Sequence, residues 1–133
     1  MAGFSRYLQQ ELLDHVLKTE AYTQPTHVYV ALMTATPSDT GGGTECAGTG
    51  YARVICDAWN AATAASPSVA DNTSIIDFGT AGGADWGTVT HLALYDALTG
   101  GNLLGWVALT ISKTINNGDP VTFPAGALDV TLD

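Results

Sequence analysis

The sequence predicts a mainly β fold: an antiparallel β-sandwich or barrel-like domain with one N-terminal amphipathic helix. Three observations predict it. One segment with a helical period begins the chain, about seven short strand-like segments follow it, and turns rich in Gly, Pro and Asn separate these segments. The 133 residues suit a single domain, with the helix over about 4–18 and the β core over about 26–132. A doubly wound α/β fold would need helices between the strands, where the chain is too short and too rich in Gly.

The predicted helix covers Phe4 to Lys18, where a large apolar residue recurs at every fourth position. Ser5 or Gly3 could cap its start, because both residue types are favoured there. We expect this helix to close one side or end of the β core. The alternative is that part of its apolar stripe docks on a neighbouring subunit.

Two strands in the second half of the chain, Thr88 to Tyr95 and Asn102 to Ile111, form the predicted centre of the fold. Gly100 and Gly101 allow the chain to reverse between them. Strict alternation puts two sets of side chains on opposite faces of the first strand: Val89, His91, Ala93 and Tyr95, and Thr90, Leu92 and Leu94. Both sets are largely apolar, so we expect other elements to cover both faces.

The remaining strands are predicted from short runs of β-branched and aromatic residues between turn sequences. They are His27 to Met33, Ile75 to Phe78, Val121 to Phe123 and Leu128 to Leu132. The run Gly41 to Gly43 lacks the Gly-Lys-Ser/Thr ending of a phosphate-binding loop, so we expect an exposed loop there. The segment Asn60 to Ser74 is small, polar and without a period, and it is predicted to be a long surface excursion.

The segment Gly50 to Trp59 alternates larger with smaller residues. We expect Ala52, Val54, Cys56 and Ala58 to face inwards, and Tyr51, Arg53, Ile55, Asp57 and Trp59 to face outwards. Aromatic residues and Arg are over-represented at the anchors of interfaces. Tyr51, Arg53 and Trp59 are therefore the candidate partner contacts. The alternative is that Tyr51 and Trp59 cover the edge of the core.

Thirteen acidic and four basic side chains leave a formal charge of −9. Nucleic-acid binding depends on contacts to phosphate, so this charge argues against DNA or RNA as a partner. The carboxylates are scattered singly and form no calcium-binding loop, and the apolar runs fall short of the ~20 residues of a membrane-spanning helix. Charged residues make up only 13%, so the surface is either partly covered by neighbouring proteins or simply neutral and rich in Thr.

The residue types that carry catalysis or bind metals form no recognisable motif. Cys46 and Cys56 belong to no C-x-x-C pair, and without a signal peptide we expect a reducing compartment and two free thiols. His15, His27 and His91 stand apart without a nucleophile elbow, and we expect His91 to have a hydrogen-bond partner. We therefore predict no catalytic residue, no cofactor and no metal.

Four stretches follow one another along the chain: FSRYLQQELLDHVLKTEAYTQPTHVYVALMTATPSDTGGGTE, GYARV, WGTVTHLALYDALTGGNLLGWVALTISKTINNGD and FPAGALDVTL. Together they resemble a family of small tailed-bacteriophage virion proteins, often labelled tail-fibre or structural proteins. The resemblance covers nearly the whole chain in order. It implies a non-enzymatic part of the virion, assembled in many copies in the cytoplasm of the host bacterium.

A compact acidic domain with a charge-poor surface suits a capsid decoration (cement) protein, which stabilises the head by bridging subunits. The alternative is a tail-fibre, baseplate or other tail-associated structural protein. A second alternative is a carbohydrate-binding module of the virion, with Trp59, Asp57 and Asn60 as the one tight cluster of suitable residues. The expected partners are other virion proteins, either the major capsid protein or tail and baseplate proteins. We also expect a homo-oligomer or multi-copy assembly, and neither nucleic acid nor a membrane as a partner.

Overall fold

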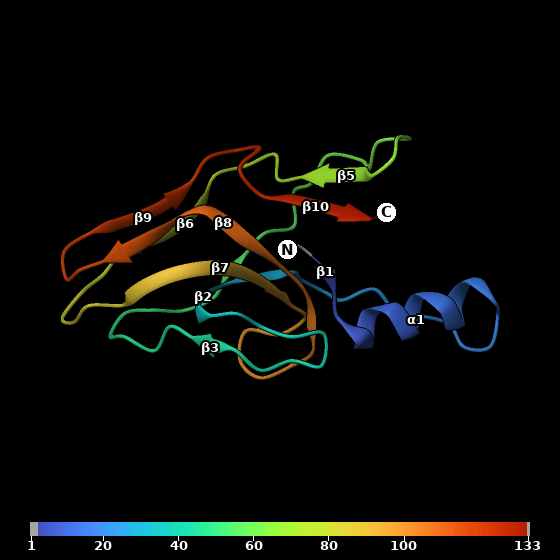
Figure 1. Cartoon of the computed structure of the whole chain (residues 1–133), viewed down its shortest axis with the longest axis horizontal. Coiled ribbons are helices and arrows are strands. Elements are labelled where there is room, and N and C mark those ends of the chain that lie inside the picture. The colour runs from blue at the N-terminus through green and yellow to red at the C-terminus, as the bar shows by residue number, and fades with distance from the viewer. Residues whose placement is uncertain (1–2, 133) are drawn as a thin grey trace.

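One antiparallel sheet forms the middle of the protein in the computed structural model, which describes residues 3–132 (Figure 1). Its strands are β1 (Gly3–Phe4), β2 (Tyr29–Ala35), β3 (Thr44–Glu45), β4 (Val54–Ile55), β7 (Gly87–Tyr95) and β8 (Leu103–Ile115). Their order is β1-β8-β7-β2-β3, and β4 also pairs with β2.

Two separate ribbons accompany this sheet: β6 (Ile76–Thr80) with β9 (Pro120–Phe123), and β5 (Ser68–Asp71) with β10 (Asp129–Leu132). Helix α1 (Arg6–Val16) lies to the side of the strands (Figure 1). Every strand pairing among residues 3–132 is antiparallel. The predicted fold class, a mainly β antiparallel fold with an N-terminal helix, is therefore confirmed.

The central hairpin is also confirmed, because β7 pairs with β8 on one side and with β2 on the other. The register of the hairpin slips between Val89 and His91, which lie opposite Lys113 and Ala108. Several residues of β8 thus bulge opposite one residue of β7. At this irregularity, Val89 lies in the same buried cluster as Leu92. The strict alternation, which put these two side chains on opposite faces, is wrong at this position.

Two apolar clusters cover opposite faces of the central strands. The larger lies between the sheet and the β6–β9 ribbon, and its buried members are Val30, Leu32, Cys46, Cys56, Ile76, Phe78, Ala81, Trp86, Val89, Leu92, Ile115, Val121 and Leu128. The smaller consists of Ala31, Met33, Ala93 and Leu103, with Tyr95 and Trp106 packed against it. Alternate residues of β2 therefore enter different clusters, so these strands are covered on both faces as expected.

The ends of α1 differ from the prediction for physical reasons. Phe4 pairs with Gly105 as part of β1, so the helix begins later, with Ser5 as its N-cap. The hydroxyl oxygen of Ser5 accepts a hydrogen bond from the backbone N–H of Leu8 at 3.2 Å, which is the usual capping bond. At the other end Lys18 adopts a left-handed φ of 62°, which stops the helix.

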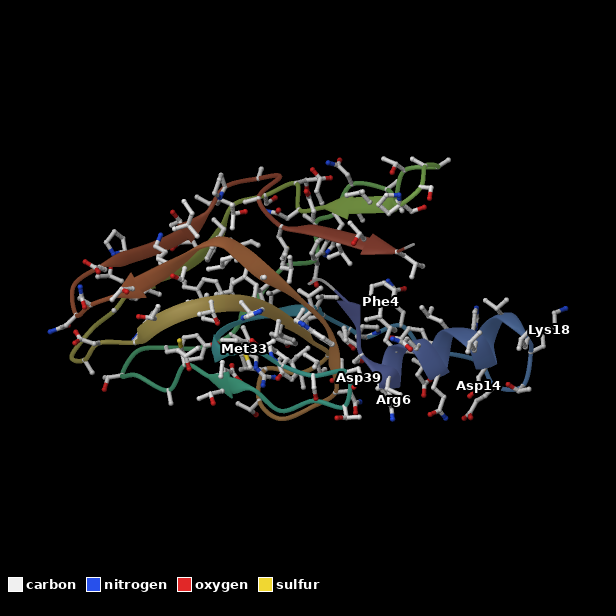
Figure 2. The ribbon with its side chains drawn as sticks, in the orientation of Figure 1. Phe4, Arg6, Asp14, Lys18, Met33 and Asp39 are labelled. Atoms are coloured by element: carbon white, nitrogen blue, oxygen red, sulfur yellow. The ribbon has the colours of Figure 1, made fainter. Side chains whose placement is uncertain are left out.

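Helix α1 extends away from the sheet. Arg6 lies at the end near the sheet, whereas Lys18 lies at the far end (Figure 2). No residue of the helix is buried, and Leu13, Val16 and Leu17 are 61%, 70% and 69% exposed. The expectation that the helix closes one side or end of the β core is therefore wrong for the part of the helix that carries these residues. Its main contacts with other elements are those to β1 and β8.

Part of the predicted surface excursion Asn60 to Ser74 is a strand. Its residues Ser68–Asp71 form β5 and pair with β10. Next to this strand Asn72 is fully buried. Its side-chain amide donates to the carbonyls of Ser74 and Pro124, and its Oδ1 accepts from the N–H of Leu128. The excursion is therefore held to the C-terminal strand, a partner that its own composition does not reveal.

Candidate functional site

Tyr51, the first candidate contact residue, lies against the core. Its ring stacks on Phe78 with centroids 6.3 Å apart and meets the ring of Trp86 edge-on at 5.5 Å. The hydroxyl donates to Oε1 of Glu45 at 2.8 Å and accepts from the N–H of Leu32 at 3.0 Å. Burial raises the pKa of this hydroxyl. The predicted outward orientation of Tyr51 is therefore wrong, and the alternative that it covers the core edge describes its position.

Arg53, the second candidate, is also turned inwards, and its side chain is only 7% exposed. The guanidinium forms two hydrogen bonds to Glu45 and donates to the carbonyls of Ala97 and Gly100 at 2.8 Å. It also lies 3.7 Å from the centroid of the Tyr95 ring. Most of its donors are thus used within the chain. Arg53 holds the β7–β8 loop, and its orientation departs from the predicted alternation because the acceptors lie inside.

Trp59, the third candidate, is half-buried beside a surface groove. Its indole N–H donates to the carbonyl of Cys56 at 2.8 Å. The groove has a volume of about 190 Å³ and is lined by Phe4, Leu8, Val28, Trp59, Ala70, Leu94, Leu104, Gly105 and Val130. We call these residues the apolar groove. The lining residues come from α1 and β1, from the β5–β10 ribbon, and from β7 and β8. Helix α1 and the β5–β10 ribbon project from the same side of the molecule (Figure 1).

Towards its C-terminal end, α1 presents an uncovered apolar surface. We call Leu13, Val16 and Leu17, which are all more than half exposed, the α1 stripe. The helix segment around it has no net formal charge, because Arg6 and Lys18 balance its two acidic residues, Glu11 and Asp14. The charge of −9 therefore lies entirely on the rest of the chain.

The histidines form pairs in the fold. Nδ1 of His27 lies 2.6 Å from Oδ2 of Asp57, and both side chains are more than 40% exposed. Nδ1 of His91 lies 2.8 Å from the hydroxyl of Thr90, so the predicted partner of His91 is confirmed. Burial lowers the pKa of the His91 imidazole. Within residues 3–132, no group of three or more His, Cys, Asp or Glu side chains could hold a metal ion.

The cluster of Trp59, Asp57 and Asn60, which carried the carbohydrate-binding alternative, is engaged in internal bonds. Asp57 accepts from the N–H of Val28 and interacts with His27. The amide of Asn60 donates to Asp71 at 2.8 Å. These polar groups hold loops together and leave few donors or acceptors for a ligand.

A family model described as Podophage GP4 fiber I protein gp80 matches residues 3–131. The chain belongs to this family. The match spans α1, the central sheet and both ribbons, and it confirms the resemblance to phage virion structural proteins. The family description favours the tail-fibre alternative over capsid decoration. No curated protein matches the sequence. In the part of the chain that the structure describes, none of the helices is long and apolar enough to span a membrane.

Proposed function

We propose that this protein is a tail-fibre component of the phage particle, without catalytic activity. The observation that carries the proposal is the fibre-protein family match over residues 3–131. The exposed α1 stripe and the apolar groove support it, because exposed apolar surface of this kind is typical of an interaction site. In this role the β fold is a rigid module that contacts other tail proteins, is present in several copies and is assembled in the host cytoplasm.

The three candidate residues contribute to this role in different ways. We propose Trp59 as a direct partner contact because it lines the apolar groove. Tyr51 and Arg53 would act indirectly by holding the strand ends and the β7–β8 loop in position. Replacing Trp59 by Ala should therefore reduce incorporation into particles more than it changes the folding of the isolated protein.

The location is tested by separating phage heads from tails and measuring the amount of this protein in each fraction. The major capsid protein serves as the marker for heads. We expect the protein with the tails, and antibody labelling of intact particles should mark the fibres. Recovery in many copies on tailless heads would overturn the proposal and support capsid decoration. Labelling of the baseplate alone would move the protein to another part of the tail.

A further inference from the structure

We propose that the apolar groove receives the α1 stripe of a second copy of this chain. Each copy then supplies one α1 stripe and one apolar groove. In a closed assembly every stripe is bound in the groove of a neighbouring copy. The α1 stripe, which is exposed on its own copy, would in this way be buried against the neighbouring copy.

The lining of the groove selects an apolar occupant. Its side chains are aliphatic or aromatic, and the one polar group among them, the indole N–H of Trp59, is bonded to Cys56. Water in such a groove finds few hydrogen-bond partners. A cavity of about 150 Å³ with similar walls accommodates benzene. The groove, at about 190 Å³, is therefore large enough for branched aliphatic side chains such as Leu13 and Val16.

The distribution of charge favours a second copy as the occupant. Two bodies that each carry −9 repel one another, so contact between copies of this chain is opposed least at a surface that lacks this charge. The segment from Arg6 to Lys18 is neutral and extends away from the sheet. A strongly basic partner would gain little at this helix, because the negative charge lies elsewhere. The apolar and neutral α1 stripe thus matches a groove whose lining is also apolar and uncharged.

The available area favours an arrangement in which every groove is filled. Stable protein interfaces bury about 1,200–2,000 Å² in total. One short helix in one groove offers only a fraction of this area, since the stripe has three large side chains and the groove is small. If two copies each place their α1 stripe in the apolar groove of the other, the buried area doubles. We therefore expect closed assemblies, either a dimer or a small ring, and not single open contacts.

The test is sedimentation velocity over a range of protein concentrations, with the wild type compared with Leu13→Gln/Val16→Gln. Both substitutions keep the charge and the helix propensity, and both positions are exposed, so the fold should be preserved. The wild type should associate, and the double variant should need about a hundredfold higher concentration, because two apolar side chains lose their burial. Salt should strengthen the association of the wild type, because it screens the repulsion. Gln10→Ala, on an exposed polar part of the same helix, is the control and should behave like the wild type.

A mixing experiment tests the groove itself. Ala70→Gln places a long polar side chain in the groove and should weaken association when present in every copy. Mixed with Leu13→Gln/Val16→Gln, it should associate again in part, because one variant has an intact stripe and the other an intact groove. A wild type that stays monomeric, an unaffected double variant, or a mixture that does not associate would each overturn the proposal. These results do not depend on where the protein lies in the particle, so they are separate from the test of the fibre role.

Discussion

Arg53 binds the carboxylate of Glu45 through two nitrogen atoms, with Nε 2.9 Å from Oε1 and Nη2 2.8 Å from Oε2. Its remaining Nη1 donates to the carbonyls of Ala97 and Gly100. One side chain therefore joins β3, the segment before β4 and the β7–β8 loop. Ala97 and Gly100 lie 44 and 47 residues from Arg53 in the sequence, so these hydrogen bonds stabilise tertiary structure and not a local turn.

Arg53→Ala should lower the free energy of unfolding by about 2–3 kcal/mol, since it leaves a partly buried Glu45 without its partner. Urea denaturation measures this change. Arg6→Ala is the matched control, because Arg6 pairs with Asp39 at 2.9 Å while both side chains remain largely exposed. It should cost no more than about 1 kcal/mol. Equal effects of the two substitutions would contradict a structural role for the Arg53 network.

Asn72→Ala should lower the free energy of unfolding by about 3 kcal/mol. It removes three hydrogen bonds and leaves the N–H of Leu128 and the carbonyls of Ser74 and Pro124 without their bonds to the side chain. Thermal or urea denaturation checks this. Asn60→Ala, at an exposed position, should change stability by about 1 kcal/mol or less. A small effect at Asn72 would show that water replaces the lost bonds.

The Asp57 carboxylate should make stability depend on pH in the acid range. Hydrogen bonds from His27 and from the N–H of Val28 lower the pKa of Asp57 below its ordinary value of 3.8. A lowered folded-state pKa means that the stabilisation is present above pH 3.8 and is lost as the pH falls through the folded-state value.

Comparing the wild type with Asp57→Asn over pH should show this dependence. The wild type should be more stable at neutral pH, by about 0.5–1 kcal/mol because the pair is exposed, and the difference should shrink below pH 3.8. A stability difference between the wild type and Asp57→Asn that stays constant down to low pH would contradict a role for the negative charge of Asp57.

Both cysteines should react slowly with thiol reagents in the folded protein. Cys46 and Cys56 are 5% and 6% exposed and form no disulfide, so the expectation of two free thiols is confirmed. Burial raises the pKa of Cys46 to about 11, and the nearby Glu45 carboxylate adds to this. Ellman's reagent near neutral pH should therefore label both thiols only after unfolding, and the single Ser variants would assign each signal. Rapid labelling of the native protein would contradict this burial.

The elements with a clear local signal were predicted from sequence. The hairpin of β7 and β8 is apolar on both faces, and the first segment of the chain has a helical period, so both were found. By contrast, β5 was missed because Ser68 to Asp71 resembles a loop in composition. Its strand exists because β10 pairs with it and Asn72 joins the two parts of the chain.

The candidate contacts were predicted less well, and for a definite reason. Alternation in the segment Gly50 to Trp59 assumes a regular strand, but only Val54–Ile55 pairs in the sheet. Outside this pair the backbone does not continue as a regular strand, so Tyr51 and Arg53 point towards acceptors on other elements. Trp59 borders the apolar groove, whereas Tyr51 and Arg53 line a separate pocket beside Leu98, and the sequence contains no signal that either hollow exists.

By itself the sequence determined the fold class, the central strand pair, the neutral helix and the membership in a phage fibre family. The first three features depend on local periodicity, composition and charge, and the family membership depends on the order of the residues along the chain, so all four can be read without the fold. The tertiary structure alone decided that Val89 turns to the same cluster as Leu92, that Arg53 is enclosed by Glu45 and the β7–β8 loop, and that the α1 stripe is left uncovered. Each of these depends on which distant backbone or side-chain groups come to lie beside a residue, and no local pattern specifies that.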